Sequence, residues 1–184
     1  MLNINFNPFP ELSTENLVLR KMSVNDAEEM FFLRSDADVL KYIDREPARS
    51  VEEAVNFIEM INTALANNEN INWAICLKDD PKLIGYICFW RIDRENHRAE
   101  IGYVLHPAMQ GRGLMHEAMK AALHYGFNTM NLHSVEANVN PENQPSIRAL
   151  EKNGFIREGY FKENYYSNGK FLDSAIYSLL TAVK

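Results

Sequence analysis

The sequence predicts one α/β domain in which a mixed, mostly antiparallel central sheet carries helices on both of its faces. Three observations lead to this fold class. The chain has 184 residues, of which 46% are hydrophobic, and this suits a single domain with a buried core. Short β-like runs alternate with longer segments whose apolar residues recur at helical spacing. The resulting order, β-α-α-β-β-β-α-β-α-β-β, is typical of a sheet covered by helices.

The predicted elements follow one another without a repeat or a linker. Residues 1–12 are expected to form an irregular lead-in, because they include Pro8 and Pro10, and residues 13–184 to form one domain. Strands are predicted at 14–22, 71–78, 82–92, 97–106, 133–140, 155–161 and 171–180. Helices are predicted at 23–33, 51–66, 114–129 and 144–153, with a helical turn at 39–43 and a chain turn at 167–169.

Local signals fix where several predicted elements begin or end. Ser23 precedes Asp26 by three residues, and Ser50 precedes Glu53 by the same spacing, so each serine is expected to cap a helix. Gly154 is expected to stop the last helix, because glycine readily adopts the left-handed conformation that follows a helix end.

Composition excludes several classes of protein. The apolar share is too high for intrinsic disorder, and 8 Gly with 7 Pro are too few for a low-complexity chain. The sequence contains no apolar run near the roughly 20 residues that span a bilayer, and its first ten residues lack the features of a signal peptide. Cys76 and Cys88 are too few for a disulfide scaffold. We therefore expect a cytoplasmic protein with buried, reduced thiols.

Negative charge is concentrated in the first third of the chain. The formal net charge is −6, and residues 11–60 hold 12 acidic and 6 basic residues. This balance argues against a nucleic-acid partner. The acidic excess has two interpretations, an acidic vestibule that attracts a cationic partner or ordinary solvated helix faces.

The segment with the clearest chemical signal is a strand that runs into a glycine-rich turn and then a helix. The turn reads Gln110-Gly111-Arg112-Gly113-Leu114-Met115. Such a turn directs main-chain N–H groups toward one point, and the helix N-terminus adds partial positive charge, so phosphate is the expected ligand. Arg112 can add a side-chain contact. The turn lacks the Gly-Lys-Ser/Thr ending of a P-loop and the third glycine of a dinucleotide fingerprint.

The turn resembles the Q/R-x-x-G-x-G/A pyrophosphate motif of the GNAT (Gcn5-related) N-acetyltransferases, with Met115 replacing the last small residue. Downstream, the spacing of Asn138, Asn140, Asn143 and Ser146 before 150–155 is similar to the RimJ/RimL branch of that family. The resemblance extends over residues 13–180. It implies the GNAT fold, acetyl-CoA as cosubstrate, and transfer of an acetyl group to a primary amine, most closely the α-amine of a protein such as a ribosomal protein.

The same resemblance implies a binding site for acetyl-CoA. Its pyrophosphate is expected on the main-chain amides of Gln110, Gly111, Arg112, Gly113, Leu114 and Met115. Its pantetheine arm is expected along the backbone of Tyr103, Val104 and Leu105, with a hydrogen bond from Asn143.

Catalytic roles are implied for Glu100 and Ser146. Glu100 stands where many relatives keep a carboxylate that accepts the proton of the amine, although it is also placed to pair with Arg91 or Arg98. Ser146 is expected near the leaving thiolate, as a hydrogen-bond donor or part of a water relay, or else as an ordinary helix hydroxyl. Leu150 occupies the position where many relatives have a tyrosine, so the general acid is not identified.

Other predictions concern metal and acceptor. The five histidines lack metal-ligand spacing, so no metal is expected. Tyr160, Tyr165 and Tyr166 are candidates for acceptor contact, with surface packing as the alternative. A small-molecule amine (a polyamine, amino sugar or amino acid) and a non-catalytic acyl-CoA-binding module are alternative functions. No membrane partner is expected, and the chain is a monomer or a homodimer.

Overall fold

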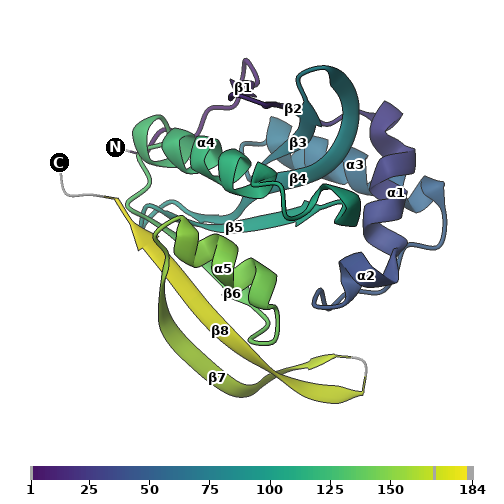
Figure 1. Ribbon diagram of the computed structural model, residues 1–184. Coiled ribbons are helices and arrows are strands. Elements are labelled where there is room, and N and C mark those ends of the chain that lie inside the picture. Colours follow the sequence, from purple (N-terminus) through teal and green to yellow (C-terminus); the bar gives the residue numbers. More distant parts are fainter. Residues whose placement is uncertain (1, 168, 182–184) are drawn as a thin grey trace.

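The computed structural model describes residues 2–167 and 169–181, so residue 168 of the predicted turn lies outside the described part. The described strands form one eight-stranded sheet in the order β1-β2-β3-β4-β5-β6-β8-β7 (Figure 1). The strands are β1 (Leu12–Ser13), β2 (Leu17–Lys21), β3 (Ile71–Leu77), β4 (Asp80–Asp93), β5 (Arg98–Leu105), β6 (Ser134–Val139), β7 (Ile156–Ser167) and β8 (Lys170–Leu180). The α-helices are α1 (Ala27–Ser35), α2 (Ala37–Leu40), α3 (Val51–Ala66), α4 (Leu114–Asn128) and α5 (Gln144–Lys152).

The pairing of the strands confirms a mixed, mostly antiparallel sheet. From β1 to β5 each strand pairs antiparallel with the next. β6 then joins β5 in parallel, and β8 and β7 continue antiparallel from β6. The parallel pair requires a crossover, and α4 supplies it.

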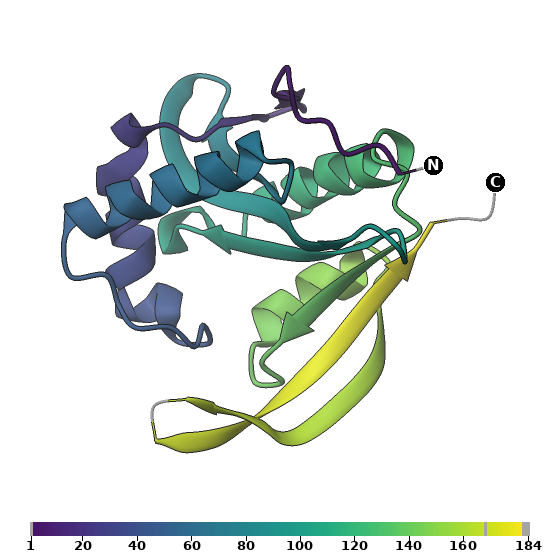
Figure 2. The ribbon, with the colours of Figure 1, turned by 180° about the vertical axis from the view of Figure 1, so that it is seen from behind.

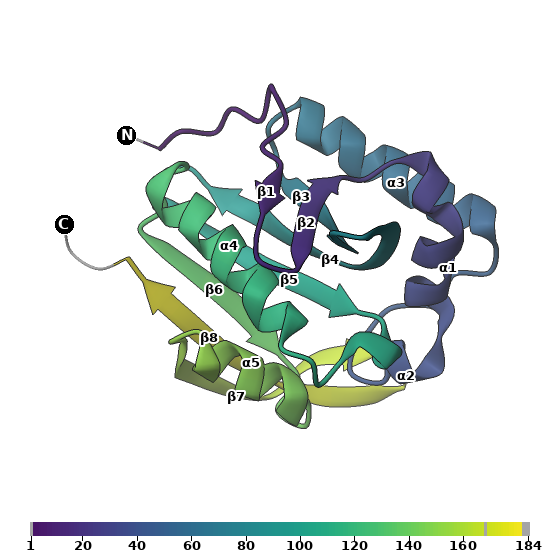
Figure 3. The same cartoon turned by 45° about the horizontal axis from the view of Figure 1, so that its top comes forward.

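Helices cover both faces of the sheet, as predicted. α4 and α5 lie on one face (Figures 1 and 3), and α3 lies on the other, as the view from behind shows (Figure 2). Each face has its own core, because alternate residues of a strand point to opposite sides. Trp73 and Ile75 pack on the side of α4, whereas Ala74 and Cys76 pack on the side of α1 and α3.

Both predicted serine caps are present, but only the one at Ser23 forms a reciprocal capping box. Ser23 and Asp26 form a reciprocal capping box that starts a 3-10 turn before α1. Ser50 accepts a hydrogen bond from the amide of Glu53 at 3.3 Å, but the Glu53 carboxylate accepts from the amide of Arg49 at 3.0 Å. β1 was not predicted, and β7 continues to Ser167, beyond the predicted end at residue 161.

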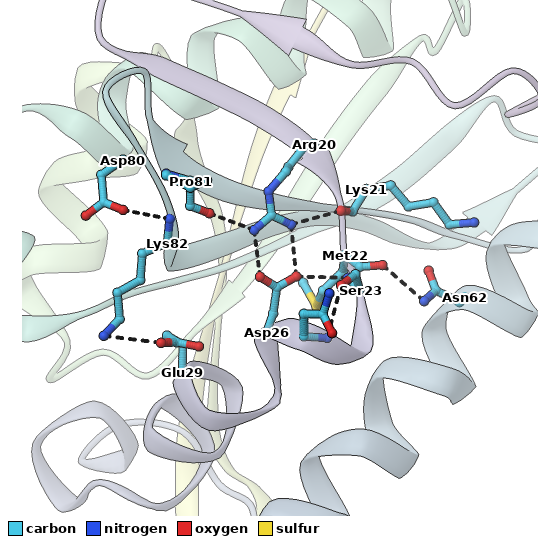
Figure 4. Close-up of polar contacts among 11 residues, drawn as sticks. Arg20, Lys21, Met22, Ser23, Asp26, Glu29, Asn62, Asp80, Pro81 and Lys82 are labelled. Carbon is cyan, nitrogen blue, oxygen red and sulfur yellow. Dashed lines mark hydrogen bonds and ion pairs between the residues drawn. The ribbon is translucent and has the colours of Figure 1, made fainter.

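The buried carboxylate of Asp26, just before α1, connects that helix to β2 (Figure 4). The guanidinium of Arg20 on β2 forms a two-pronged contact with Asp26, at 2.9 and 2.6 Å, and donates to the carbonyl of Pro81 at 2.9 Å. Next to it, Lys82 and Glu29 form an ion pair at 3.2 Å. These contacts fix α1 against β2 and β4, beside the cleft described below.

Within the described residues, no helix is both long and apolar enough to cross a membrane.

Candidate active site

A cleft opens where β5 and β6 separate. The two strands pair only over Arg98–Glu100 and Ser134–Glu136 of the described chain, although β5 continues to Leu105 and β6 to Val139. The cleft encloses about 560 Å³. Its wall includes residues 100–104, residues 137–140 and the first turns of α5. Tyr103 and Val104, two of the three residues beside which the family resemblance expects pantetheine, line this cleft, whereas Leu105 is not part of its described wall.

The glycine-rich turn follows the end of β5 and leads into α4. Gly111 and Gly113 have φ of 73° and 80°, which glycine adopts without strain, and a Cβ at either would have no described heavy atom within 4 Å. The first helical hydrogen bond runs from the Glu117 amide to the Gly113 carbonyl at 3.1 Å. The amides of residues 114–116 therefore point out of the helix end.

Side chains secure this turn without filling it. The Gln110 amide group donates to the Leu105 carbonyl at 3.2 Å, and the Arg112 guanidinium lies 3.2 Å from the Met109 sulfur on the surface. An open turn that presents amides and a nearby cation fits a pyrophosphate. The turn therefore fits the linked phosphates of CoA.

Glu100 is buried in the cleft wall, with 7% of its surface exposed. Burial raises the pKa of its carboxyl, and the Arg91 guanidinium, whose Nη1 lies 2.9 Å from Oε2, opposes that rise. Arg98 pairs instead with Glu136 at 3.0 Å. Of the two partners expected for Glu100, the structure selects Arg91, and it also leaves Glu100 on the cleft.

Arg91 reaches Glu100 because β4 is irregular at that point. The register between β4 and β5 shifts between Trp90 and Asp93, and Arg91 has a φ of 46°. Its guanidinium lies 4.2 Å from the centre of the Trp90 ring, a cation–π contact. Arg91 and Trp90 both line the cleft.

Ser146 and Asn143 lie at the start of α5, on the opposite wall from β5. The Asn143 side chain accepts a hydrogen bond from the Ser146 amide at 3.2 Å and so caps the helix. Its oxygen is thereby used, and its NH₂ group is the part suited to donate to a ligand. The Ser146 hydroxyl lies 2.6 Å from the phenol oxygen of Tyr103, and burial raises the pKa of that phenol to about 12. Leu150, fully buried, lines the cleft one helical turn further on.

The other side of the cleft is formed by distant segments of the chain. Asp44, which follows α2, accepts a hydrogen bond from the Tyr165 phenol on β7. Arg45 lies beside the Tyr86 hydroxyl, at 3.5 Å. Phe57 and Met60 of α3 complete this side. Sequence reasoning missed Asp44 and Arg45, because nothing in the local pattern around Pro47 distinguishes them.

The three candidate tyrosines do not act together. Tyr165 lines the cleft. Tyr160 donates a hydrogen bond to Asp173, and the Tyr166 ring packs 5.1 Å from that of Phe171 with 65% of Tyr166 exposed, so neither contributes to the described cleft wall. For these two, the alternative of surface packing describes the structure better.

The described cleft wall does not support the interpretation of an acidic vestibule. Of the acidic residues between 11 and 60, the described cleft wall contains only Asp44, and Arg45 is its neighbour. Glu100 is likewise matched by Arg91. The described cleft wall therefore holds little of the acidic excess of residues 11–60.

Both cysteines are buried and free, as expected. Burial raises the pKa of the Cys88 thiol to about 12, so this cleft-lining sulfur stays protonated and is a poor nucleophile. Among the described residues, His, Cys, Asp and Glu form no group that could hold a metal ion.

Comparisons with known proteins agree with this arrangement. The family model "Acetyltransferase (GNAT) domain" matches residues 16–156. An uncharacterized N-acetyltransferase, p20, of Bacillus licheniformis is 38% identical over 92% of this chain and 95% of its own length. The [ribosomal protein uS5]-alanine N-acetyltransferase of Escherichia coli is 29% identical over 95% of this chain and 92% of its own.

A solved structure gives the same result at the level of the fold. Spermidine N-acetyltransferase from Vibrio cholerae, in complex with CoA and spermine, superposes with a TM-score of 0.79 at 26% identity, over 89% of this chain and 95% of that one. The family match covers most of the chain and includes the glycine-rich turn and the diverging strands. The chain therefore belongs to the GNAT family and is an acetyl-CoA-dependent N-acetyltransferase.

Proposed function

We propose that this chain transfers the acetyl group of acetyl-CoA to the α-amine of a protein N-terminus. The observation that carries the proposal is the polarity of the acceptor side. Each of the two carboxylates on the described cleft wall already has a partner, Glu100 with Arg91 and Asp44 with Tyr165. A polycation such as a polyamine needs several free carboxylates, whereas a peptide end brings a single charged amine.

Neutral amide side chains support the same acceptor. Asn70, Asn72, Asn138 and Asn140 line the cleft. Each side-chain amide both donates and accepts hydrogen bonds, which matches the alternating N–H and C=O groups of a peptide backbone. The similarity to the uS5-alanine N-acetyltransferase of Escherichia coli favours a protein acceptor as well. The similarity to a spermidine N-acetyltransferase makes a small polyamine the alternative to be tested.

The cosubstrate is expected to be held by main chain at one end of the cleft and by α5 at the other. The amides of residues 111–115 are expected to bind its pyrophosphate, residues 103–105 to run beside its pantetheine arm, and the Asn143 NH₂ group to donate to that arm. The Gln110 main-chain amide, also expected at the pyrophosphate from the family resemblance, instead donates to the Pro107 carbonyl at 3.1 Å. When bound, acetyl-CoA supplies an activated acyl group and a thiolate leaving group.

Two residues of the chain are proposed to assist the reaction at the amine and at the leaving sulfur. Glu100 accepts the proton that the attacking amine loses, and burial, which raises its pKa, makes its carboxylate a stronger base than an exposed one. Ser146 supplies a hydroxyl near the site of the departing sulfur.

An acceptor panel tests the proposal. Purified protein and acetyl-CoA are mixed with peptides that begin with a free α-amine, with the same peptides already N-acetylated, with spermidine and with single amino acids, and thiol release is followed. We expect release with free peptides and none above background with blocked ones. Faster turnover of spermidine than of every peptide would contradict the proposal.

A further inference from the structure

We propose that Tyr103 is a positioning residue for acetyl transfer: its phenol donates a hydrogen bond to Ser146 and thereby directs the Ser146 hydroxyl hydrogen at the departing sulfur. This inference rests on the proposed function, since it takes CoA to be bound in the cleft. It assigns a role to the Tyr103 side chain, which sequence reasoning considered only for its backbone.

The two hydroxyls meet across the cleft. Tyr103 belongs to β5 and Ser146 to α5, and both line the cleft wall. Their oxygens are 2.6 Å apart, and the phenol oxygen is also 3.4 Å from the Ser146 carbonyl. This contact links the two walls at the level where α5 begins.

Either hydroxyl of this pair could donate, and we assign the donor role to the phenol because it is the more acidic of the two. Burial raises the pKa of Tyr103 to about 12, so the phenol keeps its one hydrogen at neutral pH. Both neighbouring oxygens of Ser146 can accept that hydrogen, and the hydroxyl is the nearer. When the Ser146 hydroxyl accepts from Tyr103, its own hydrogen is left to donate to another group, and Ser146 lines the cleft in which the sulfur would lie.

The fold places this donor and the base on opposite sides of β5. Tyr103 packs with the core on the side of α4, whereas Val104, which shares the strand face of Glu100, packs with the core beneath α1 and α3. Glu100 and the Tyr103–Ser146 pair line the same cleft, so the base and the hydroxyl donor can reach the reacting thioester from different sides. Leu150, which also lines the cleft, has no hydrogen to donate, whereas Tyr103 and Ser146 each carry a hydroxyl there.

The proposed step balances without another reactant. The bond from nitrogen to the acetyl carbon forms, and the bond from that carbon to sulfur breaks. Glu100 takes one proton from the amine, and the thiolate takes one from solvent water after it leaves. Tyr103 and Ser146 gain and lose none, because they stabilise the negative charge through hydrogen bonds only.

The test measures the thiol of bound CoA, which needs no acceptor. Its pKa is obtained from the ultraviolet absorbance of the thiolate as pH is raised, for the wild type, Tyr103→Phe, Ser146→Ala and the double variant. We expect Tyr103→Phe to raise that pKa by about one unit and to lower kcat about tenfold, with KM and the Kd for CoA unchanged. The double variant should equal Ser146→Ala, because Tyr103 acts through Ser146.

Tyr125→Phe is the matched control, since Tyr125 is another buried tyrosine with a raised pKa but lies in α4 outside the described cleft wall. It should leave both measurements unchanged. Two results would overturn this inference without affecting the proposed function. One is an unaltered thiol pKa in Tyr103→Phe, and the other is a kcat of the double variant that is lower than that of Ser146→Ala by the factor seen in Tyr103→Phe. A wild type that binds CoA but acetylates no peptide would overturn the proposed function instead.

Discussion

The cofactor side and the acceptor side of the cleft are built by different means. On the cofactor side, the turn follows β5 directly and presents main-chain amides whose directions depend on backbone angles. On the acceptor side, side chains from distant segments meet, as Asp44 and Tyr165 do across 121 residues. Most side-chain substitutions leave a main-chain site intact, whereas a site made of side chains changes with each one. The acceptor side is thus where relatives that share a cosubstrate are free to differ in substrate.

Glu100 stands where the two sides meet, so its replacement should have the largest effect. We expect Glu100→Gln to lower kcat on the order of 100-fold, because a general base contributes about that much or more, and to leave the Kd for CoA unchanged. In the wild type, kcat/KM should rise with pH through a pKa above the usual carboxyl value, because burial favours the protonated form and only the ionised form accepts a proton.

Glu136→Gln is the control for that variant, because Glu136 is the register partner of Glu100 on β6 and pairs with Arg98. Its kcat should stay near that of the wild type, while the acidic limb moves to lower pH, because the Glu136 charge contributes to the raised pKa of Glu100. Steady-state thiol release across pH measures both variants. Equal rates for Glu100→Gln and wild type would remove Glu100 from the role of base.

Variants of two glycines with the same φ distinguish an effect on CoA binding from an effect on stability. Gly113 and Gly169 both have a φ of 80°, and a Cβ added at either position would meet no described heavy atom within 4 Å. Replacement by Ala should cost each about 1 kcal/mol of unfolding free energy. Gly113→Ala alone should also weaken CoA binding about tenfold, because the shifted backbone turns its amides away from the phosphates. Calorimetry and thermal unfolding measure the two effects, and equal CoA affinity in both variants would contradict a main-chain site.

Replacing Arg91, the ion-pair partner of Glu100, tests whether the acceptor side sets the substrate preference. Removing its charge in Arg91→Gln should raise the pKa of Glu100 further, so the acidic limb of kcat/KM moves to higher pH. The unpaired carboxylate should also favour a polycation, lowering the KM for spermidine relative to a peptide several-fold. Arg98→Gln, which breaks the neighbouring ion pair, should do neither. An unchanged pH profile and unchanged substrate preference would show that Arg91 has no part in acceptor selection.

The Tyr165–Asp44 contact should give the smallest effect. Tyr165→Phe removes one hydrogen bond between β7 and the segment after α2, and we expect the acceptor KM to rise about two- to fivefold. The Kd for CoA should not change. Tyr166→Phe, in the next residue but packed on Phe171, is the control. A change in CoA binding that matches the change in KM would mean that the two sides of the cleft are not separable.

How far each side could be predicted follows from the same difference. The sequence predicted the turn and the element order, because these depend on local signals such as Gly111, Gly113 and the strand before them. The sequence offered Arg91 and Arg98 as partners of Glu100, but the choice of Arg91 depends on an irregular residue in β4 that no short pattern marks. The Tyr103–Ser146 contact depends on how α5 lies against β5, which only the tertiary structure shows. The charge count left two interpretations open for a similar reason, because it does not say which charged side chains face the cleft.

The central claim is that the main-chain amides at the start of α4 bind the linked phosphates of CoA. The most direct measurement is a calorimetric titration of the wild-type protein with CoA and with pantetheine, which carries the same thiol arm without the phosphates or nucleotide. The account predicts that CoA binds at least about 100-fold more tightly, the range expected when several charge-assisted hydrogen bonds are lost. Equal affinity for the two ligands, or no heat with CoA, would contradict it.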